Sequence, residues 1–280
     1  MEGRKDRVKE IKMKEMEQRN RLAKEYDRFI SDYQHKVEIA SAIDEINPKG
    51  GEYILDAGCG TGRITYRLME AGCNAICVDF SKESLKVSKQ KCSALNKGNL
   101  YLIIADVCNL PLKDCSFDKC ISTEVFEHIP SEEERLKMLQ ELHRVLKPGG
   151  KLILTTYNYS LRKIIGRKRE TFSGELYFYR YDYFKLKHTI STVFDGKIKI
   201  IGILNLIHWL PVNMLNKFEK FLIPIDKFIK KTPFSYLLAH LLCVKCEKIC
   251  ANCGNNGDFD RDKNTKELPK EKQRGKETER

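Results

Sequence analysis

The chain has 280 residues, a formal net charge of +12 and 41% apolar residues. That apolar content supports a globular core, and without about 20 consecutive apolar residues no membrane-spanning helix is expected. The first residues contain no apolar h-region, so we expect no secretory signal and a cytoplasmic location. In that compartment most of the eleven cysteines should be free thiols. Cys77 and Cys120 fall inside strand patterns and are expected to be small buried apolar groups.

The basic excess is concentrated between residues 157 and 250, where 17 Lys and Arg stand against 7 Asp and Glu. Such a surplus fits an anionic substrate, an anionic membrane surface or nucleic acid, and it also serves simple solubility. The basic surplus therefore lies in the second half of the chain, and it does not distinguish between these classes of ligand.

The N-terminal part favours helices. The first 25 residues are strongly charged good helix formers, and we expect a solvated helix there. Tyr26–Ile46 has apolar residues at helical spacing, which predicts a helix laid over a sheet edge.

A glycine-rich loop follows the first strand. Residues 53–55 form an apolar strand that runs into Asp56, and alternate glycines come next, namely Gly58, Gly60 and Gly62. A strand, a glycine loop and a helix bring backbone against a nucleotide-like ligand in parallel α/β sheets. Arg63 stands where a dinucleotide fingerprint needs its third glycine, and no Lys-Ser/Thr pair closes the loop as in a P-loop.

Acidic residues follow the next two strands as well. Asn74–Val78 ends at Asp79, and Tyr101–Ala105 ends at Asp106. A carboxylate at such a strand end can accept hydrogen bonds from two ribose hydroxyls. One strand-end acid is usually only a cap, but acids at three successive carboxyl ends favour a ligand site.

Together with the strands Phe117–Ser122 and Lys151–Thr155, these landmarks resemble the class I S-adenosylmethionine (SAM) methyltransferases of the small-molecule type (methyltransferase type 11), over roughly residues 30–160. The resemblance implies an α/β fold of the Rossmann-like, doubly wound kind. Its mostly parallel seven-stranded sheet has an antiparallel last strand and is accompanied by a helical cap. It also implies SAM as the cofactor, bound by Asp56, Gly58, Gly60, Gly62, Asp79, Phe80, Asp106, Val107 and Thr123.

The expected organisation has four parts. A charged N-terminal helix (1–25) precedes the SAM-binding core (26–160). A substrate-side cap with the last strands of the same domain covers 157–250. Residues 254–280 are charged, contain almost no apolar residues and are expected to be disordered.

Methyl transfer from a sulfonium is an in-line displacement, so alignment of the reactants dominates. An oxygen or nitrogen nucleophile can also need a base for its proton. His128 and Glu124 follow the fourth strand and are the candidates. Structural roles, at a helix start for His128 and as a helix cap for Glu124, fit them equally well.

Glu124, Glu127 and His128 form an E-x-x-E-H run. It resembles the metal-ligating run of the ubiquinone-biosynthesis O-methyltransferases and of the small-RNA 2′-O-methyltransferases. The resemblance implies a divalent metal that would lower the pKa of a chelating acceptor oxygen. The same run also occurs in relatives with no known metal, and no fourth ligand is identified.

Cys243, Cys246, Cys250 and Cys253 have the spacing C-x2-C-x3-C-x2-C. Zinc sites usually separate their two C-x2-C pairs by a dozen residues or more. Leu241–Cys246 also reads as a last strand, in which positions three apart face opposite sides. A metal site and a plain strand both remain open here.

Residues 207–231 combine aromatic and aliphatic residues with lysines at helical spacing. A basic amphipathic helix of this kind can lie in a membrane interface, although such a stripe more often packs on its own domain. Peripheral membrane contact through this segment is therefore an open hypothesis.

We expect a SAM-dependent methyltransferase that acts on O or N of a small-molecule, possibly lipid-linked, acceptor. One alternative is an RNA methyltransferase, although no recognised RNA-binding module is visible. The other is a non-catalytic SAM-binding or interaction protein.

Overall fold

The computed structural model describes residues 2–159, 166, 168–205 and 211–249. The helices are α1 (Glu2–Leu22), α2 (Asp32–Ile46), α3 (Arg63–Glu70), α4 (Lys82–Cys92), α5 (Glu132–Val145), α7 (Tyr183–Ser191), α8 (Val212–Lys217), α9 (Glu219–Lys230) and α10 (Ser235–Leu238), with 3-10 turns η1 (Tyr26–Phe29) and η2 (Phe126–His128). The strands are β1 (Tyr53–Ala57), β2 (Asn74–Asp79), β3 (Leu100–Ile104), β4 (Phe117–Thr123), β5 (Leu146–Tyr157), β6 (Glu170–Ser173), β7 (Leu176–Tyr179), β8 (Lys199–Ile203) and β9 (Leu241–Glu247).

Seven strands form one sheet in the order β3-β2-β1-β4-β5-β9-β8. The first five pair in parallel, whereas β9 runs antiparallel between β5 and β8. The expected mostly parallel sheet with an antiparallel last strand is thus confirmed. All seven expected strands form in this sheet, because each is a short apolar run bounded by turn residues.

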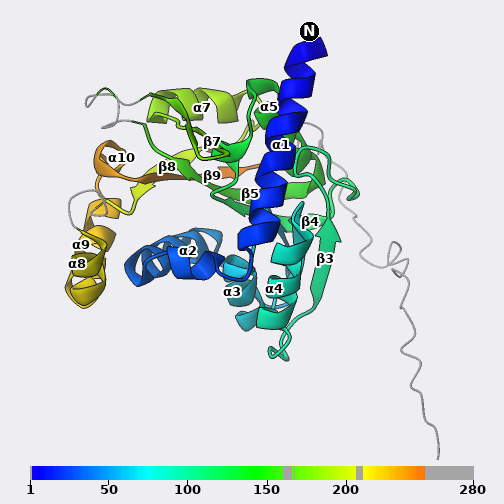
Figure 1. The fold of residues 1–280 in the computed structure, drawn as a ribbon. Helices are drawn as coiled ribbons and strands as arrows, with labels where there is room; N and C mark the ends of the chain where they lie inside the picture. The colour runs from blue at the N-terminus through cyan, green and yellow to red at the C-terminus, as the bar shows by residue number, and fades with distance from the viewer. Residues whose placement is uncertain (1, 160–165, 167, 206–210, 250–280) are drawn as a thin grey trace, which may run out of the picture. The chain divides into compact units, whose positions relative to one another are not determined.

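Helices cover both faces of the sheet (Figure 1). One buried cluster joins β-strand side chains to α5 and α7, and the other joins them to α2, α3 and α4. Successive side chains of a strand point to opposite faces of the sheet. In β1, Leu55 accordingly packs in the first cluster and Ile54 in the second. Two-sided burial explains why these strands read as continuous apolar runs.

The expected helix over Tyr26–Ile46 is broken in two. Ile30 is extended after η1, and the Ser31 hydroxyl accepts a hydrogen bond from the Gln34 N–H at 3.1 Å. With Ser31 as its N-cap, a new helix, α2, begins at Asp32.

The N-terminal helix α1 forms, and most of its first half is exposed as expected of a solvated helix, whereas one face of its second half packs on the domain. It lies across the carboxyl ends of the central strands (Figure 1), through Lys12 to Asp106, Arg19 to His128 and Asn20 to Ser81. Polar side chains, rather than an apolar stripe, make most of these contacts, which is why hydropathy did not reveal the packing.

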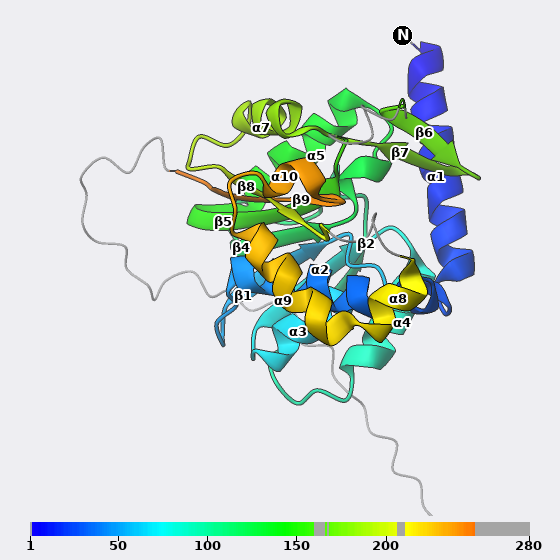
Figure 2. The same cartoon turned by 90° about the vertical axis from the view of Figure 1, so that its left-hand side faces the viewer.

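The cap contains a β-hairpin, β6–β7, in addition to the expected helices (Figure 2). Tyr177 is buried in the hairpin, and β7 packs against α1 and η2. α7 follows the hairpin, and Asp182 caps its first turn. Residues 160–165 and 167 lie outside the described residues.

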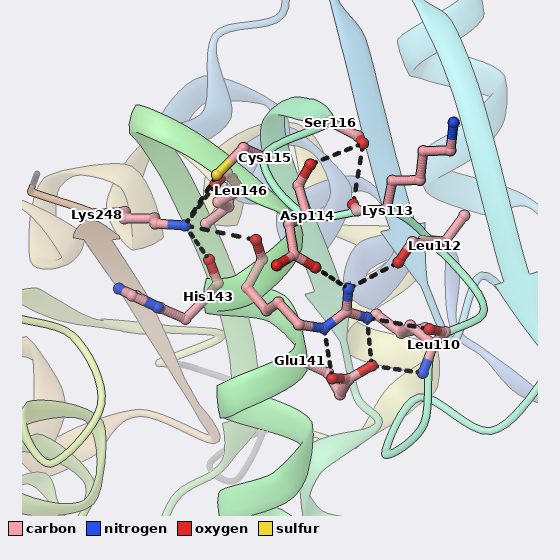
Figure 3. A network of polar contacts seen from close by, with 11 residues as sticks. Leu110, Leu112, Lys113, Asp114, Cys115, Ser116, Glu141, His143, Leu146 and Lys248 are labelled. Carbon is pink, nitrogen blue, oxygen red and sulfur yellow. Dashed lines mark hydrogen bonds and ion pairs between the residues drawn. The ribbon is translucent and has the colours of Figure 1, made fainter.

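One cation joins the loop after β3 to α5, and a second joins the end of α5 to the residue after β9 (Figure 3). The Arg144 guanidinium donates to the carbonyls of Leu110 and Leu112 and pairs with Asp114 at 2.6 Å. Lys248 donates to the carbonyls of His143 and Leu146 at the C-terminal end of α5. A cation there also complements the helix dipole.

Cys243 and Cys246 are both buried in β9, yet they belong to opposite core clusters. They therefore cannot share one metal ion. Cys250 and Cys253 lie outside the described residues, as does the expected disordered tail. Cys77 and Cys120 are buried as expected. In the ranges that the structure describes, no helix has both the length and the apolar content needed to cross a bilayer.

Candidate active site

A cavity opens at the carboxyl ends of β1, β2, β3 and β4, and α1 forms its cover. Each strand end contributes to its wall. The residues supplied by the strand ends include Gly58, Gly60, Thr61, Asp79, Phe80, Asp106, Val107, Thr123, Glu124 and His128. The helix and the turn after it supply Lys12, Glu15, Arg19, Ala23 and Tyr26.

The glycine loop brings bare backbone to this wall. Gly58 has a φ of 76°, and a Cβ there would overlap the Val125 side chain. Its N–H donates to the Val78 carbonyl at 2.7 Å, which fixes the loop against β2. Gly62 does not line the cavity; a Cβ there would overlap Ser88 of α4. Gly58 thus leaves room for Val125, Gly60 leaves open space at the cavity wall, and Gly62 leaves room for a helix.

Asp79 lines the cavity with a buried carboxylate. Its two oxygens accept the backbone N–H groups of Gly60 and Ser81, both at 2.8 Å. Burial raises the pKa of Asp79, and these hydrogen bonds oppose the shift. Each oxygen keeps a further lone pair, so the carboxylate can accept two hydroxyl groups of a ribose.

Asp56 lies below the loop and does not line the cavity. Its carboxylate is only 1% exposed and accepts a hydrogen bond from the Thr65 hydroxyl at 2.6 Å. Burial raises the pKa of Asp56 to about 7. In this arrangement Asp56 supports the glycine loop through α3 and does not face a ligand directly.

Asp106 is partly exposed and already has two partners. One oxygen accepts the Cys108 N–H at 2.9 Å, and the other pairs with Lys12 Nζ at 2.7 Å. Lys12 also contacts Glu134 at 2.5 Å. Within the described part of the chain, Asp106, Cys108 and Glu134 are the only set of three donors close enough to hold a metal. The Lys12 ammonium supplies the positive charge there.

The E-x-x-E-H side chains engage different partners. Glu124 takes a φ of 53° after β4 and pairs with Arg63 at 3.2 Å. Arg63 in turn reaches Glu38 at 3.3 Å. Burial, followed by the charge of Glu124, raises the pKa of Glu38 to about 8. This buried group of one guanidinium and two carboxylates fixes the turn after β4 against α2 and α3.

Glu127 points away from the cavity. Its side chain is fully buried, and burial together with the neighbouring Glu124 raises its pKa well above the usual range. Both effects favour the neutral carboxyl group over the carboxylate.

His128 is held between two fixed partners. Its Nδ1 lies 2.9 Å from the Tyr177 carbonyl oxygen, and its Nε2 lies 3.1 Å from the Arg19 guanidinium. A carbonyl only accepts and a guanidinium only donates, so Nδ1 carries the proton and Nε2 the lone pair. Burial, and then the charge of Arg19, lowers the pKa of His128 to about 3. The imidazole is therefore neutral.

The structure brings seven of the nine expected cofactor residues onto one wall and leaves Asp56 and Gly62 behind it. The sequence missed the contributions of α1 and of Arg63. Lys12, Glu15, Arg19 and Ala23 recur every three or four positions and so share one helix face. That spacing was visible, but charged residues at such spacing usually face solvent.

Residues 55–154 match the family described as "Methyltransferase domain". The chain is 37% identical over 138 residues to the demethylmenaquinone methyltransferase of Staphylococcus epidermidis, covering 47% of this chain and 55% of that protein. It is 38% identical over 107 residues to a tRNA (carboxymethyluridine(34)-5-O)-methyltransferase of Arabidopsis thaliana, covering 38% of this chain and 24% of that protein. The chain thus spans about half the length of the first relative and about a quarter of the second.

A solved structure has the same fold. It is a putative methyltransferase of Haloferax volcanii in complex with the Trm112 methyltransferase activator, with a TM-score of 0.60 and 17% identity, covering 83% of this chain and 98% of that one. The glycine cradle, the buried strand-end carboxylate and the sheet order agree with the family match. Residues 55–154 thus belong to this methyltransferase-domain family, and the fold is that of SAM-dependent methyltransferases.

Proposed function

We propose that this protein transfers a methyl group from SAM to an oxygen or nitrogen atom of a small-molecule acceptor. The observation that carries the proposal is the cavity wall, where Gly58, Gly60 and Asp79 fit a nucleoside without a pyrophosphate. The similarity to a demethylmenaquinone methyltransferase supports a small-molecule acceptor.

In this proposal Asp79 binds the ribose hydroxyls, and Asp106 and Val107 flank the adenine. Bound SAM supplies an activated methyl group on a sulfonium. The chain's own task is then to align the acceptor and to exclude water. The α1 helix serves the second task, because it covers the cavity between Lys12 and Ala23.

The acceptor end of the cavity would be formed by Arg19, Tyr26, Arg63, Glu124 and His128. We propose that His128 or Glu124 takes the acceptor's proton. The neutral His128 has a lone pair on Nε2, but Arg19 donates to it, and burial with the charge of Arg19 makes the imidazole a weak base. Proton transfer to His128 therefore requires the acceptor to displace the Arg19 guanidinium.

A divalent metal at Glu124, Glu127 and His128 stays a prediction. Arg63 pairs with Glu124, and Arg19 and Tyr177 occupy both nitrogens of His128. Metal binding would need these contacts to break. If activity is abolished by a chelator and restored by one added metal, the metal has a role; activity that survives chelation removes it.

The deciding experiment offers labelled SAM and fractionated host extract to the purified protein. Label in the lipid or small-molecule fraction supports the proposal. The basic cap and the plant tRNA enzyme make RNA the second candidate, and label released by RNase would favour it. SAM binding by calorimetry without label in any fraction would favour a non-catalytic protein. Absence of SAM binding would reject both the cofactor and the activity.

A further inference from the structure

The helix α9 has an inner and an outer face of different composition. Its inner face packs on the domain through Leu222, Ile223 and the buried Asp226, which accepts the Asn205 N–H at 2.6 Å. The outer face carries Phe221 and Phe228, which are 74% and 72% exposed. An inner face with its own partners means that the outer aromatics are not needed to hold α9 in place.

The outer stripe continues along α8. Met214, Phe218, Phe221, Ile225 and Phe228 are all exposed and follow one another at steps of four, three, four and three residues. α8 and α9 meet at Phe218, where the Phe218 N–H donates to the Met214 carbonyl and the Leu222 N–H to the Phe218 carbonyl, so the helical spacing continues and the five residues share one side. We call these five residues the aromatic face. Figure 2 shows α8 and α9 at the outside of the domain, over α2.

Lysines border the aromatic face. Lys217, Lys220, Lys227 and Lys231 are exposed and each stands three or four positions from the next, apart from the gap at Pro224. Among the described residues no ion pair involves any of these four. The two acidic residues of α9 face inward, where Asp226 is buried and Glu219 pairs with Lys36 at 2.6 Å. The outer side thus has positive charge without any negative charge.

We propose that the aromatic face and its bordering lysines bind the surface of an anionic lipid bilayer. Aromatic and aliphatic side chains enter the boundary between headgroups and acyl chains, and lysines beside them reach anionic headgroups. Charge complementarity favours an anionic bilayer over an apolar groove of another protein, because lysines without ion-pair partners would contribute nothing to binding in an apolar groove. The chain would lie on the membrane, and docking does not depend on the proposed methyl transfer.

The test is co-sedimentation of the full chain with vesicles of phosphatidylcholine alone or mixed with phosphatidylglycerol. Binding is expected only to the mixed vesicles, and it should weaken as salt rises. Replacing two aromatics (Phe221→Ser with Phe228→Ser) should reduce the partition coefficient about tenfold or more. The matched control is Phe184→Ser, because Phe184 on α7 is 73% exposed and lies outside this face.

A second test distinguishes the effect of the bordering lysines on vesicle binding from the effect of the net charge of the chain. Lys220→Glu, Lys227→Glu and Lys231→Glu together should abolish binding. The same three changes at the exposed Lys97, Lys113 and Lys187 alter the net charge equally and should reduce binding much less.

SAM affinity, measured on each variant by calorimetry, should be unchanged, so a failure of docking is distinguished from a failure of the methyltransferase assignment. If the wild-type chain does not bind anionic vesicles, the proposal is wrong. If light scattering shows a dimer that Phe221→Ser with Phe228→Ser dissociates, a second copy covers the face instead, and the proposal is equally wrong.

Discussion

At Asp79, two backbone N–H groups donate to a carboxylate whose pKa burial raises, and these hydrogen bonds oppose that shift. They favour the charged form, which accepts hydrogen bonds, at the point where the proposed ribose lies. The same arrangement explains why a strand-end acid can bind a ligand while Asp56, one strand away, serves only its own helix.

Asp79→Asn should weaken binding of SAM or S-adenosylhomocysteine by about tenfold or more, since hydrogen bonds to a charged group contribute roughly 1.5–3 kcal/mol. An amide keeps the size of the side chain but has only one oxygen to accept hydroxyl groups. Calorimetry measures the affinity, and thermal unfolding checks that the variant is folded. The control is Asp44→Asn, because Asp44 is exposed and far from the cavity wall. Equal affinity of Asp79→Asn and wild type would reject the ribose assignment.

His128 links stability to pH, because its imidazole is buried and neutral in the folded chain. Its pKa is about 3 in the folded state and 6.5 for the ordinary side chain. Below pH 6.5 the unfolded chain binds a proton that the folded chain does not, so stability from this residue is present above pH 6.5 and is lost as the pH falls.

His128→Asn removes this proton-binding group while keeping a donor near the Tyr177 carbonyl. The difference in unfolding free energy between wild type and variant should shrink by about 2 kcal/mol from about pH 7.5 to about pH 5. Urea denaturation at several pH values gives the difference. A difference that does not vary with pH would mean that His128 is protonated in the folded chain as readily as in the unfolded one.

Among the elements, α1 depends most on polar contacts. It reaches the turns after β2, β3 and β4 through Asn20, Lys12 and Arg19. Few apolar side chains of α1 join the core clusters, so the cover of the cavity is held more weakly than the sheet. Such a helix can open to admit a ligand without disturbing the strands.

Lys12→Ala should loosen this cover. Amide hydrogen exchange in the middle of α1 should become about fivefold faster, because a partly exposed ion pair contributes roughly 1 kcal/mol. The exchange of β1 and β4 should not change. Lys14→Ala is the matched control, since Lys14 pairs only within the helix, with Glu10. Equal acceleration by both substitutions would mean that Lys12 does not anchor α1.

For the molecule as a whole, the packing on both sides of the sheet determines the reactivity of its thiols. Of the nine cysteines in the described part of the chain, Cys115 is exposed and the other eight are buried. Burial raises the pKa of Cys120 and of Cys243, which reduces their reactivity further.

A variant with Cys115, Cys250 and Cys253 changed to Ser should therefore resist an aromatic disulfide reagent in its native state. In denaturant its remaining eight thiols should all react. The absorbance of the released thiolate counts them, and the wild-type chain serves as the reactive control. Rapid native reaction of the variant would show that at least one of these eight thiols is not buried as described.

The sequence by itself determined the sheet, the glycine loop and the strand-end acids, because each depends on neighbours within a few positions. Apolar runs bounded by glycine and polar turns specify strands locally. The carboxyl ends of parallel strands then meet at one edge, and so Gly58, Asp79 and Asp106 could be assigned together.

Only the tertiary structure decided which side chains of amphipathic or charged segments find partners. The charged face of α1 and the aromatic face of α8 and α9 both have helical spacing, and spacing is the same for a packed face and an exposed one. The outcome reversed both default readings, since charged α1 residues line the cavity and aromatic α9 residues face outward. The α1 face contacts residues far away in the chain, such as Asp106 and His128, which no local pattern could identify.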